Sequence, residues 1–309
     1  MSAAEGLSRW FRPLRGKAPV TVSAGLEHSP RQRIKDQPGG LEWSGYETDF
    51  FVPVSQDCEE EWALTGDFSL ADVRTEAVLP DSGTAFPDRL WDIELGLLHR
   101  RLLANRWTLG MNVSVSSPSD RPFNGWDETA VGLNAFLKIP ENRQNAWVVF
   151  LNYSSNREFL PHVPIPGGGY LYAPSRDFTA LVGIPLLFFR YRPIPPLSFG
   201  GAYFPIHSIS VNGEFAFSRR FSVFTGFRWV NIRYYRAKRE DKEDRLFLYA
   251  KRIESGIKIK APAGFEAEIA GAYAFDRFFF EGEGYDDRLD NRVEIGDGFI
   301  FRVNLTASF

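Results

Sequence analysis

Apolar and polar residues alternate with a period of two through most of this 309-residue chain, over segments of roughly ten residues or more. In "WTLGMNVSVS" every second side chain from Trp107 to Val115 is apolar, and Thr108 and Asn112 lie between them. The final segment, "GFIFRVNLTASF", repeats the pattern and ends on Phe309. Successive side chains of a β-strand point to opposite faces, whereas a helix repeats every 3.6 residues. The chain is therefore predicted to be all-β.

Fourteen strands are predicted from the alternation and from the turn residues that interrupt it. They cover residues 18–27, 40–54, 61–73, 88–101, 106–116, 127–138, 146–156, 179–191, 196–204, 208–218, 221–236, 245–260, 264–279 and 293–309. The alternation is least regular in the eighth and ninth, around "IPLLFFRYRPIPP", and without that pair the chain has twelve strands. Connections after even-numbered strands are mostly short, and those after odd-numbered strands are mostly longer and more polar. An even strand count places both termini on the side of the short turns.

A soluble β-sandwich or β-solenoid also alternates, with its apolar face inward. Several predicted strands are much longer than the usual five or six residues. Aromatic residues on the apolar face also gather near both strand ends, as at two lipid–water interfaces. The proposed girdle comprises Trp62, Trp91, Trp107, Trp147 and Trp229. A sheet in lipid must close on itself, because lipid cannot hydrogen-bond the backbone. We therefore expect a closed antiparallel up-and-down transmembrane β-barrel over residues 18–309, preceded by a periplasmic or plug segment at residues 1–17.

Composition excludes several other classes of protein. Charged residues make up 24% of the chain and aromatic residues 15%, which suggests two chemically distinct faces. The net charge of −3 argues against a general nucleic-acid binder. The single cysteine, Cys58, excludes an internal disulfide and a cysteine-rich zinc site, and no apolar run is long enough for a transmembrane helix. The start, "MSAAEGLSRWFRPLRGK", lacks the apolar core of a signal peptide, so export would require a signal already removed or a different start.

The last strand resembles the assembly signal of bacterial outer-membrane proteins, in which alternating outward apolar residues end in Phe or Trp. Phe301, Val303, Leu305 and Phe309 match that pattern. The resemblance implies a barrel in the outer membrane of a Gram-negative bacterium, in contact with its lipid and recognised by the barrel-assembly machinery. Across its length the chain also resembles, more loosely, the uncharacterised DUF6268-type outer-membrane β-barrel family. That family carries no assigned chemistry, so it supplies no functional residue.

The inward-facing positions carry charges of both signs. These candidates for lining the lumen and setting its selectivity are Asp67, Asp92, Glu94, Glu128, Glu214, Arg228, Arg252, Glu254, Lys258, Glu266, Glu268 and Arg302. Opposite charges on neighbouring strands also stabilise a sheet, so the alternative is that they only satisfy a polar interior. The turn at 261–264 is expected to place Lys258 roughly opposite Glu266, and inward glycines such as Gly110 and Gly256 favour an open path.

A fourteen-stranded barrel lies between filled eight-stranded barrels and open barrels of 16–18 strands. Two segments could block such a lumen. The first is residues 1–17, which are basic and amphipathic around Trp10 and Phe11. The second is the predicted loop 157–178, which combines apolar residues with Pro and Gly. The alternative for this loop is an ordered outer loop.

Other chemistries receive little support. The acidic loop "EGEGYDDRLDN" (281–291) misses the spacing of an EF-hand and is interpreted as a solvated loop. His207 and Ser208 are adjacent, but adjacent strand residues point to opposite faces, and no "GxSxG" motif occurs. His28 falls in a predicted loop. We expect no enzyme, no metal site and no cofactor.

The sequence thus predicts a porin-like passive channel for small polar or amphipathic solutes. The alternative is a closed structural or surface-binding barrel without a permeation path.

Overall fold

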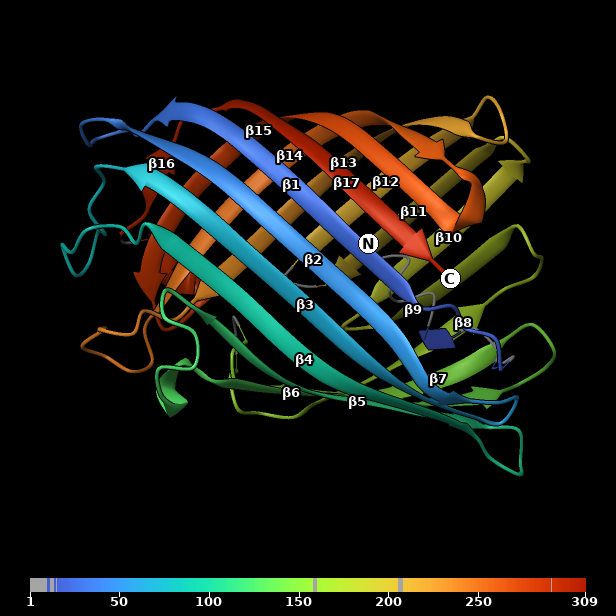
Figure 1. The fold of residues 1–309 in the computed structure, drawn as a ribbon. Helices are drawn as coiled ribbons and strands as arrows, with labels where there is room; N and C mark the ends of the chain where they lie inside the picture. The colour runs from blue at the N-terminus through green and yellow to red at the C-terminus, as the bar shows by residue number, and fades with distance from the viewer. Residues whose placement is uncertain (1–9, 12–13, 15, 158–159, 205–207, 290) are drawn as a thin grey trace.

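The computed structural model describes residues 10–11, 14, 16–157, 160–204, 208–289 and 291–309 (Figure 1). In this part of the chain sixteen antiparallel strands close into one barrel, and a short seventeenth strand extends the last of them. The barrel closes where β1 pairs with both β2 and β17. No helix among the described residues is long and apolar enough to cross a membrane. The strands are β1 (Thr21–Arg33), β2 (Gly40–Gln56), β3 (Glu60–Thr75), β4 (Arg89–Leu102), β5 (Thr108–Ser119), β6 (Ala130–Pro140), β7 (Ala146–Ser154), β8 (Ile165–Tyr172), β9 (Phe178–Ile184), β10 (Leu187–Ile194), β11 (Leu197–Phe204), β12 (Ser208–Ala216), β13 (Phe221–Tyr234), β14 (Arg245–Lys260), β15 (Phe265–Gly282), β16 (Val293–Ile295) and β17 (Gly298–Ser308).

The closed antiparallel barrel is confirmed, but the predicted count of fourteen strands is two too low. Strand β8 lies inside the predicted loop 157–178, and the predicted strand 179–191 is two strands, β9 and β10, joined at Pro185 and Leu186. Adding two strands leaves the count even, so the chain ends stay on the side of the short turns. There Val20 and Phe309 exchange backbone hydrogen bonds of 3.1 and 2.9 Å. This end of the barrel is called the turn end below, and the opposite end the loop end.

Strand β8 escaped prediction because its glycines suggest a turn. In the structure Gly167 lies beside the Phe150 ring of β7, and a Cβ at this position would come within 2.1 Å of that ring. Gly110 is in the same position relative to Phe136, at 2.0 Å. Both glycines therefore make room for an aromatic ring on the neighbouring strand. The expectation that Gly110 widens the lumen is wrong, because the ring fills the space.

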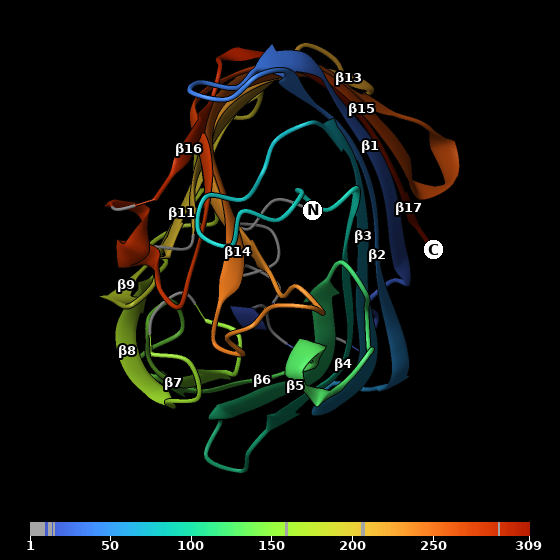
Figure 2. The same cartoon turned by 90° about the vertical axis from the view of Figure 1, so that its left-hand side faces the viewer.

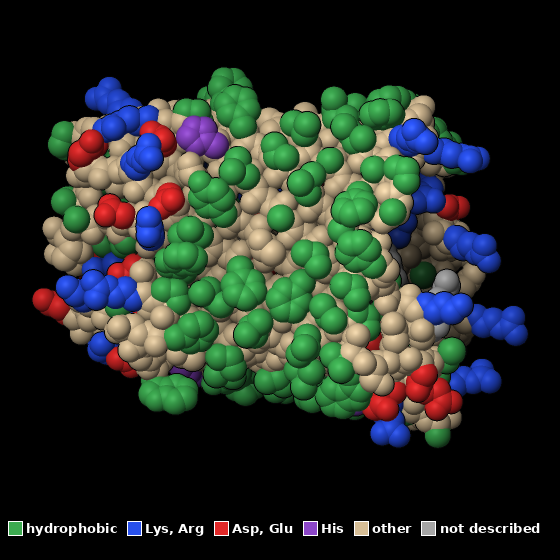
Figure 3. Space-filling model, in the orientation of Figure 1, with side chains coloured by type: hydrophobic (Ala, Val, Ile, Leu, Met, Phe, Trp, Pro, Cys, Tyr) green, Lys and Arg blue, Asp and Glu red, His purple; other side chains and the backbone are tan. Residues whose placement is uncertain are grey.

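The apolar face of the alternating strands points outward. On β5, Leu109, Met111, Val113 and Val115 are all exposed. Figure 3 shows apolar side chains covering the outer surface between two ends rich in charged residues. A soluble sandwich would bury this face, so the outward apolar surface excludes that alternative. In the last strand Phe301, Val303, Leu305 and Phe309 are likewise exposed.

The barrel wall is much taller on one side than on the other. Strand β15 has 18 residues, whereas β9 has 7. At about 3.4 Å per residue these strands span roughly 60 and 24 Å. At the turn end, short turns are hydrogen-bonded to the end of the next strand, as from Ala216 N of β12 to Pro196 O at 2.7 Å, so the extra length lies at the loop end. Viewed from the loop end, β14 and the connections around it extend into the barrel outline (Figure 2).

Candidate permeation path through the barrel

The interior contains two cavities with a small space between them, called the neck below. The loop-side cavity has a volume of about 670 Å³, and the turn-side cavity about 560 Å³. A space of about 40 Å³ lies between them. It shares Glu27 and Glu47 with the loop-side cavity, and Arg228 and Arg302 with the turn-side cavity. The neck is therefore lined by charges of both signs.

The turn-side cavity contains a chain of ion pairs in which the signs alternate. Lys258 Nζ lies 3.2 Å from Glu214 and 3.6 Å from Glu268. Arg302 Nη2 continues the chain, at 2.6 Å from Glu268 and 3.2 Å from Glu254. Lys258, Glu268 and Arg302 each pair with two partners, on the adjacent strand or on the next one along, which restrains their positions in the lumen.

Two more pairs connect this chain to the neck. Arg228 Nη2 lies 3.2 Å from Glu254, and Arg252 Nη1 lies 2.6 Å from Glu27. The Lys258–Glu266 pairing expected from the sequence is two residues out of register, because Lys258 is opposite Glu268 and Lys260 is opposite Glu266. Near the neck and in the turn-side cavity, charges are therefore largely compensated.

The loop-side cavity instead carries a row of like charges. Asp49 of β2 is directly opposite Asp67 of β3, which is directly opposite Glu94 of β4. Within the described chain, neither Asp67 nor Glu94 makes an ion pair. These directly opposed carboxyl groups make this wall of the cavity acidic, and their mutual repulsion acts against pairing of the strands. Asp92 lines the same wall, and four arginines line other parts of the cavity: Arg157, Arg233, Arg252 and Arg277.

Described residues of the N-terminal segment pack inside the turn end. The rings of Trp10 and Phe11 lie 5.4 and 5.3 Å from that of Phe136, a buried residue of β6. Arg100 donates to the Trp10 carbonyl at 3.3 Å, and Lys138 donates to the Phe11 carbonyl at 3.1 Å. Residues 1–9, 12–13 and 15 of the predicted plug segment lie outside the described residues.

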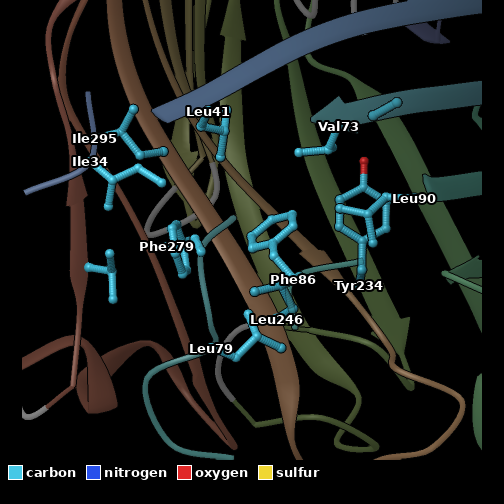
Figure 4. Close-up of a cluster of buried hydrophobic side chains, with 13 residues drawn as sticks. Ile34, Leu41, Val73, Leu79, Phe86, Leu90, Tyr234, Leu246, Phe279 and Ile295 are labelled. Atoms are coloured by element: carbon cyan, nitrogen blue, oxygen red, sulfur yellow. The ribbon is translucent and has the colours of Figure 1, made fainter. Parts of the chain in front are cut away.

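At the loop end, the connection between β3 and β4 folds into the barrel. Leu79 and Phe86 of this connection are buried in an apolar cluster with Leu246 and Phe279 from the tall strands (Figure 4). The rings of Phe86 and Phe279 lie 5.0 Å apart, edge to face. This inward hairpin, residues 76–88, occupies the position that the sequence analysis assigned to residues 157–178. The sequence signal for this hairpin is the presence of apolar residues, such as Leu79 and Phe86, in a connecting segment.

A buried carboxylate holds the tip of the inward hairpin. Glu281 of β15 is 1% exposed and accepts hydrogen bonds from the Ser82 amide at 2.9 Å and the Ser82 hydroxyl at 2.8 Å. It also forms an ion pair with Arg236, which donates to Thr84 at 3.1 Å. Partial burial, with the charges of Asp241, Asp81 and Glu281 nearby, raises the pKa of the Asp244 carboxyl above its usual range.

Opposite walls of the barrel meet at this end. The amide of Tyr235, just after β13, donates to the Pro118 carbonyl of β5 at 2.7 Å, and Tyr235 forms a parallel bridge with Ser119. Strands β5 and β13 are eight apart in a barrel of sixteen. Arg239 continues the contact, with an ion pair of 3.1 Å to Glu128 in which both side chains are almost fully buried. The loop end is therefore bridged from wall to wall.

Most of the predicted residues occupy strands, whereas Trp107, Glu128 and Phe309 lie outside them. Glu128 lies in the 3-10 turn η1 (Trp126–Glu128) ahead of β6, and its partner Arg239 follows β13. Trp147 is exposed on the outer surface, whereas Trp229 packs against Tyr249 at 5.8 Å. Of the remaining girdle, Trp62 stacks on His99 at 3.9 Å, and Trp91 and Trp107 are partly exposed.

Two histidines bear on the enzyme question. His28 lies in β1, not in a loop as predicted, and its Nδ1 is 3.1 Å from the Ser44 hydroxyl. His207 lies outside the described residues. In the described part of the chain, no group of three or more His, Cys, Asp or Glu side chains is placed to hold a metal ion.

Comparison with known proteins gives only distant likenesses. No family model and no curated protein sequence matches the chain, so the resemblance to the DUF6268-type family stays a prediction. Among solved structures, the chain is similar to an outer-membrane channel from Pseudomonas putida F1, with 10% identity, a TM-score of 0.41 and coverage of 94% of this chain and 96% of that one. It is also similar to the Pseudomonas putida toluene transporter TodX, with 9% identity, a TM-score of 0.40 and coverage of 94% and 90%. A third is the translocator domain of the autotransporter NalP from Neisseria meningitidis, with 11% identity, a TM-score of 0.35 and coverage of 99% and 93%.

Proposed function

We propose that this chain is an outer-membrane channel for the passive passage of small polar or amphipathic solutes. The observation that carries the proposal is a polar interior path, two cavities of about 670 and 560 Å³ joined by a charged neck, inside a barrel with an apolar exterior. An outward apolar face carries no desolvation cost against lipid, and closure of the sheet satisfies its backbone hydrogen bonds. The polar residues then face a lumen rather than the membrane.

The proposed selectivity elements are the neck and the row of like charges formed by Asp49, Asp67 and Glu94, called the acidic row below. Glu27, Arg228 and Arg302 line the neck and are held in place by ion pairs. This favours a fixed upper limit on the size of a solute that passes. Asp67 and Glu94 make no ion pair among the described residues and favour cations in the loop-side cavity. The arginines of that cavity limit the preference, so we propose modest rather than strict cation selectivity.

Solute entry into vesicles tests the proposal. The refolded chain, checked by the change in gel migration between unheated and boiled samples, is placed in liposomes suspended in isotonic solutions of uncharged sugars of increasing size. Swelling with small sugars that declines with size supports a channel with a size limit. If neither the folded wild type nor the hairpin variant described below swells with any of the sugars, the proposal is contradicted.

A second candidate is a barrel without a permeation path, active at the cell surface through its loops. The contact between Tyr235 and Pro118 and the inward hairpin favour this alternative, because both lie across the loop end. The two candidates separate in a variant that releases the hairpin, such as Glu281→Gln combined with Ser82→Ala. Swelling by this variant supports a channel whose mouth these residues close, and continued absence of swelling supports the closed barrel.

A further inference from the structure

The turn end carries an arc of exposed arginines along one side of the barrel. These residues, called the basic arc, are Arg143, Arg176, Arg192, Arg219 and Arg220. They lie in or beside the short connections between β6 and β7, β8 and β9, β10 and β11, and β12 and β13. Figure 3 shows Lys and Arg side chains projecting at this end, beyond the apolar belt.

Hydrogen bonds between neighbouring connections make the arc continuous. Gln144 donates to the Pro174 carbonyl at 3.1 Å, which joins the first connection to the second. The Arg192 amide donates to the Asp177 carbonyl at 2.7 Å, and the Ala216 amide at the end of β12 donates to the Pro196 carbonyl of the third connection at 2.7 Å. The arginines are therefore carried on adjacent parts of one ordered rim rather than on separate loops.

The charge of the arc is poorly compensated. Among the residues that the structure describes, none of the five arginines makes an ion pair. Three carboxylates lie beside the arc: Glu141 accepts a hydrogen bond from the Tyr170 hydroxyl, Asp177 is exposed, and Glu266 lies 4.0 Å from Lys260. Asp57, Glu59 and Glu60 belong to the same end but lie at the connection between β2 and β3. An excess of positive charge therefore faces outward from this rim.

Aromatic side chains lie beside the basic arc, at the turn ends of the same strands. Tyr172 and Phe178 lie 6.1 Å apart, Phe178 and Tyr191 lie 5.8 Å apart, and Phe217 stacks on Phe221 at 6.1 Å. Each is within a few residues of an arginine of the arc. Aromatic rings on a barrel exterior mark the lipid–water boundary, so the guanidinium groups lie at the depth of lipid headgroups.

From these observations we infer that the basic arc binds the phosphate groups of anionic phospholipids in the leaflet at the turn end. The inference rests on the membrane location proposed above. Clusters of four to eight basic residues beside a membrane segment attract anionic lipids. All five residues are arginine, whose planar fork matches two phosphate oxygens at once, whereas lysine offers a single point charge.

Native mass spectrometry of the full chain in a neutral detergent tests the inference. Folding is checked first by the heat-dependent shift in gel migration. Bound dihexanoyl phosphatidylglycerol, dihexanoyl phosphatidylcholine and inorganic phosphate are then counted separately. We expect phosphatidylglycerol to bind at least about tenfold more tightly than phosphatidylcholine. The variant R176Q/R192Q/R219Q/R220Q should lose most of this ratio.

A matched control removes four exposed arginines from the loop end, as R74Q/R89Q/R121Q/R292Q, and should keep the ratio. An unchanged ratio in the arc variant overturns the inference, as does equally tight binding of inorganic phosphate, which would indicate a free-anion site. A folded wild-type barrel without any preference for the anionic lipid also overturns it and leaves the proposed channel untouched. Failure to form the heat-shifted barrel contradicts the membrane location itself, so the two failures are distinguishable.

Discussion

The amide of Tyr235 donates a hydrogen bond of 2.7 Å to the carbonyl of Pro118, and this bond joins opposite walls of the barrel at the loop end. These residues belong to opposite walls, eight strands apart. The contact forms because β13, β14 and β15 are long enough to bend over the mouth, where β14 packs with the inward hairpin. The loop end is thus the closed end of the path, and the ion pairs of Lys258 and Arg302 line the turn-side cavity.

Release of the inward hairpin should increase permeation. Glu281→Gln removes the charge that accepts from Ser82 and pairs with Arg236, and a broken buried ion pair is destabilising by roughly 3–5 kcal/mol. We expect longer open times in single-channel recordings. Glu283→Gln, at an exposed position two residues away, should behave as wild type. Unchanged open times in the first variant would show that the hairpin does not limit passage.

Neutralising the acidic row should reduce cation preference. In Asp67→Asn with Glu94→Gln, the adjacent like charges of β3 and β4 are lost, while the paired network around Arg302 is retained. Reversal potentials in a salt gradient should move toward zero by roughly half or more. Asp88→Asn, at an exposed position of the loop end, is the control. A reversal potential that stays at the wild-type value would remove Asp67 and Glu94 from the selectivity path.

Shortening the N-terminal contact should widen the turn-side entrance. Trp10→Ala with Phe11→Ala removes two rings from Phe136 and leaves the barrel strands intact. If this segment is a plug, single-channel conductance should rise in the variant. Trp147→Ala, which removes an exposed ring from the outer surface, serves as the matched control. Equal conductance in all three proteins would mean that the segment only packs against the wall.

Loop closure should weaken as pH rises. Burial and neighbouring carboxylates raise the pKa of Asp244, so it is neutral at low pH and becomes a repulsive charge above its raised pKa. A raised folded-state pKa of an acid contributes stability that is lost with increasing pH. Open probability measured from roughly pH 4 to 7 should therefore increase. Asp244→Asn should flatten this dependence, and an equally steep profile in the variant would assign it to other groups.

The last residue should matter for assembly more than for stability. Phe309 is exposed on the outside, and its ring meets Phe265 at 5.9 Å, edge to face. If the barrel-assembly machinery reads the final strand, Phe309→Ala should lower the fraction of heat-shifted barrel in membranes of expressing cells. Refolding of the same variant in detergent should remain near wild type. An equal loss in both settings would indicate a structural role only.

The architecture could be predicted because apolar and polar residues alternate on strands such as β5, which indicates an apolar environment on one face and a polar one on the other. A strand with lipid outside and water inside needs both faces, and a helix cannot supply this period. The number of strands could not be predicted in the same way. The local sequence around Gly167 indicates a turn, whereas in the structure this glycine makes room for the Phe150 ring on the neighbouring strand. That requirement is set by strand pairing, which no local pattern contains.

The charged interior was predicted in kind but not in its connections. The alternation along the strands indicates that both signs face inward, yet Arg252 pairs with Glu27, which is 225 residues away in the chain. Such pairs depend on barrel closure and register, and a shift of two residues was enough to misplace the partner of Lys258. The inward hairpin was missed for a different reason, because Leu79 and Phe86 lie in a connection where apolar residues carry no periodic signal.

Single-channel recording in a planar bilayer is the most direct test of the central claim, a conducting path through two cavities that is closed by contacts at the loop end. The folded wild type should give discrete conductance steps, and Glu281→Gln should spend more time open. If neither protein conducts although both are folded and inserted, the cavities are isolated spaces and the chain is not a channel.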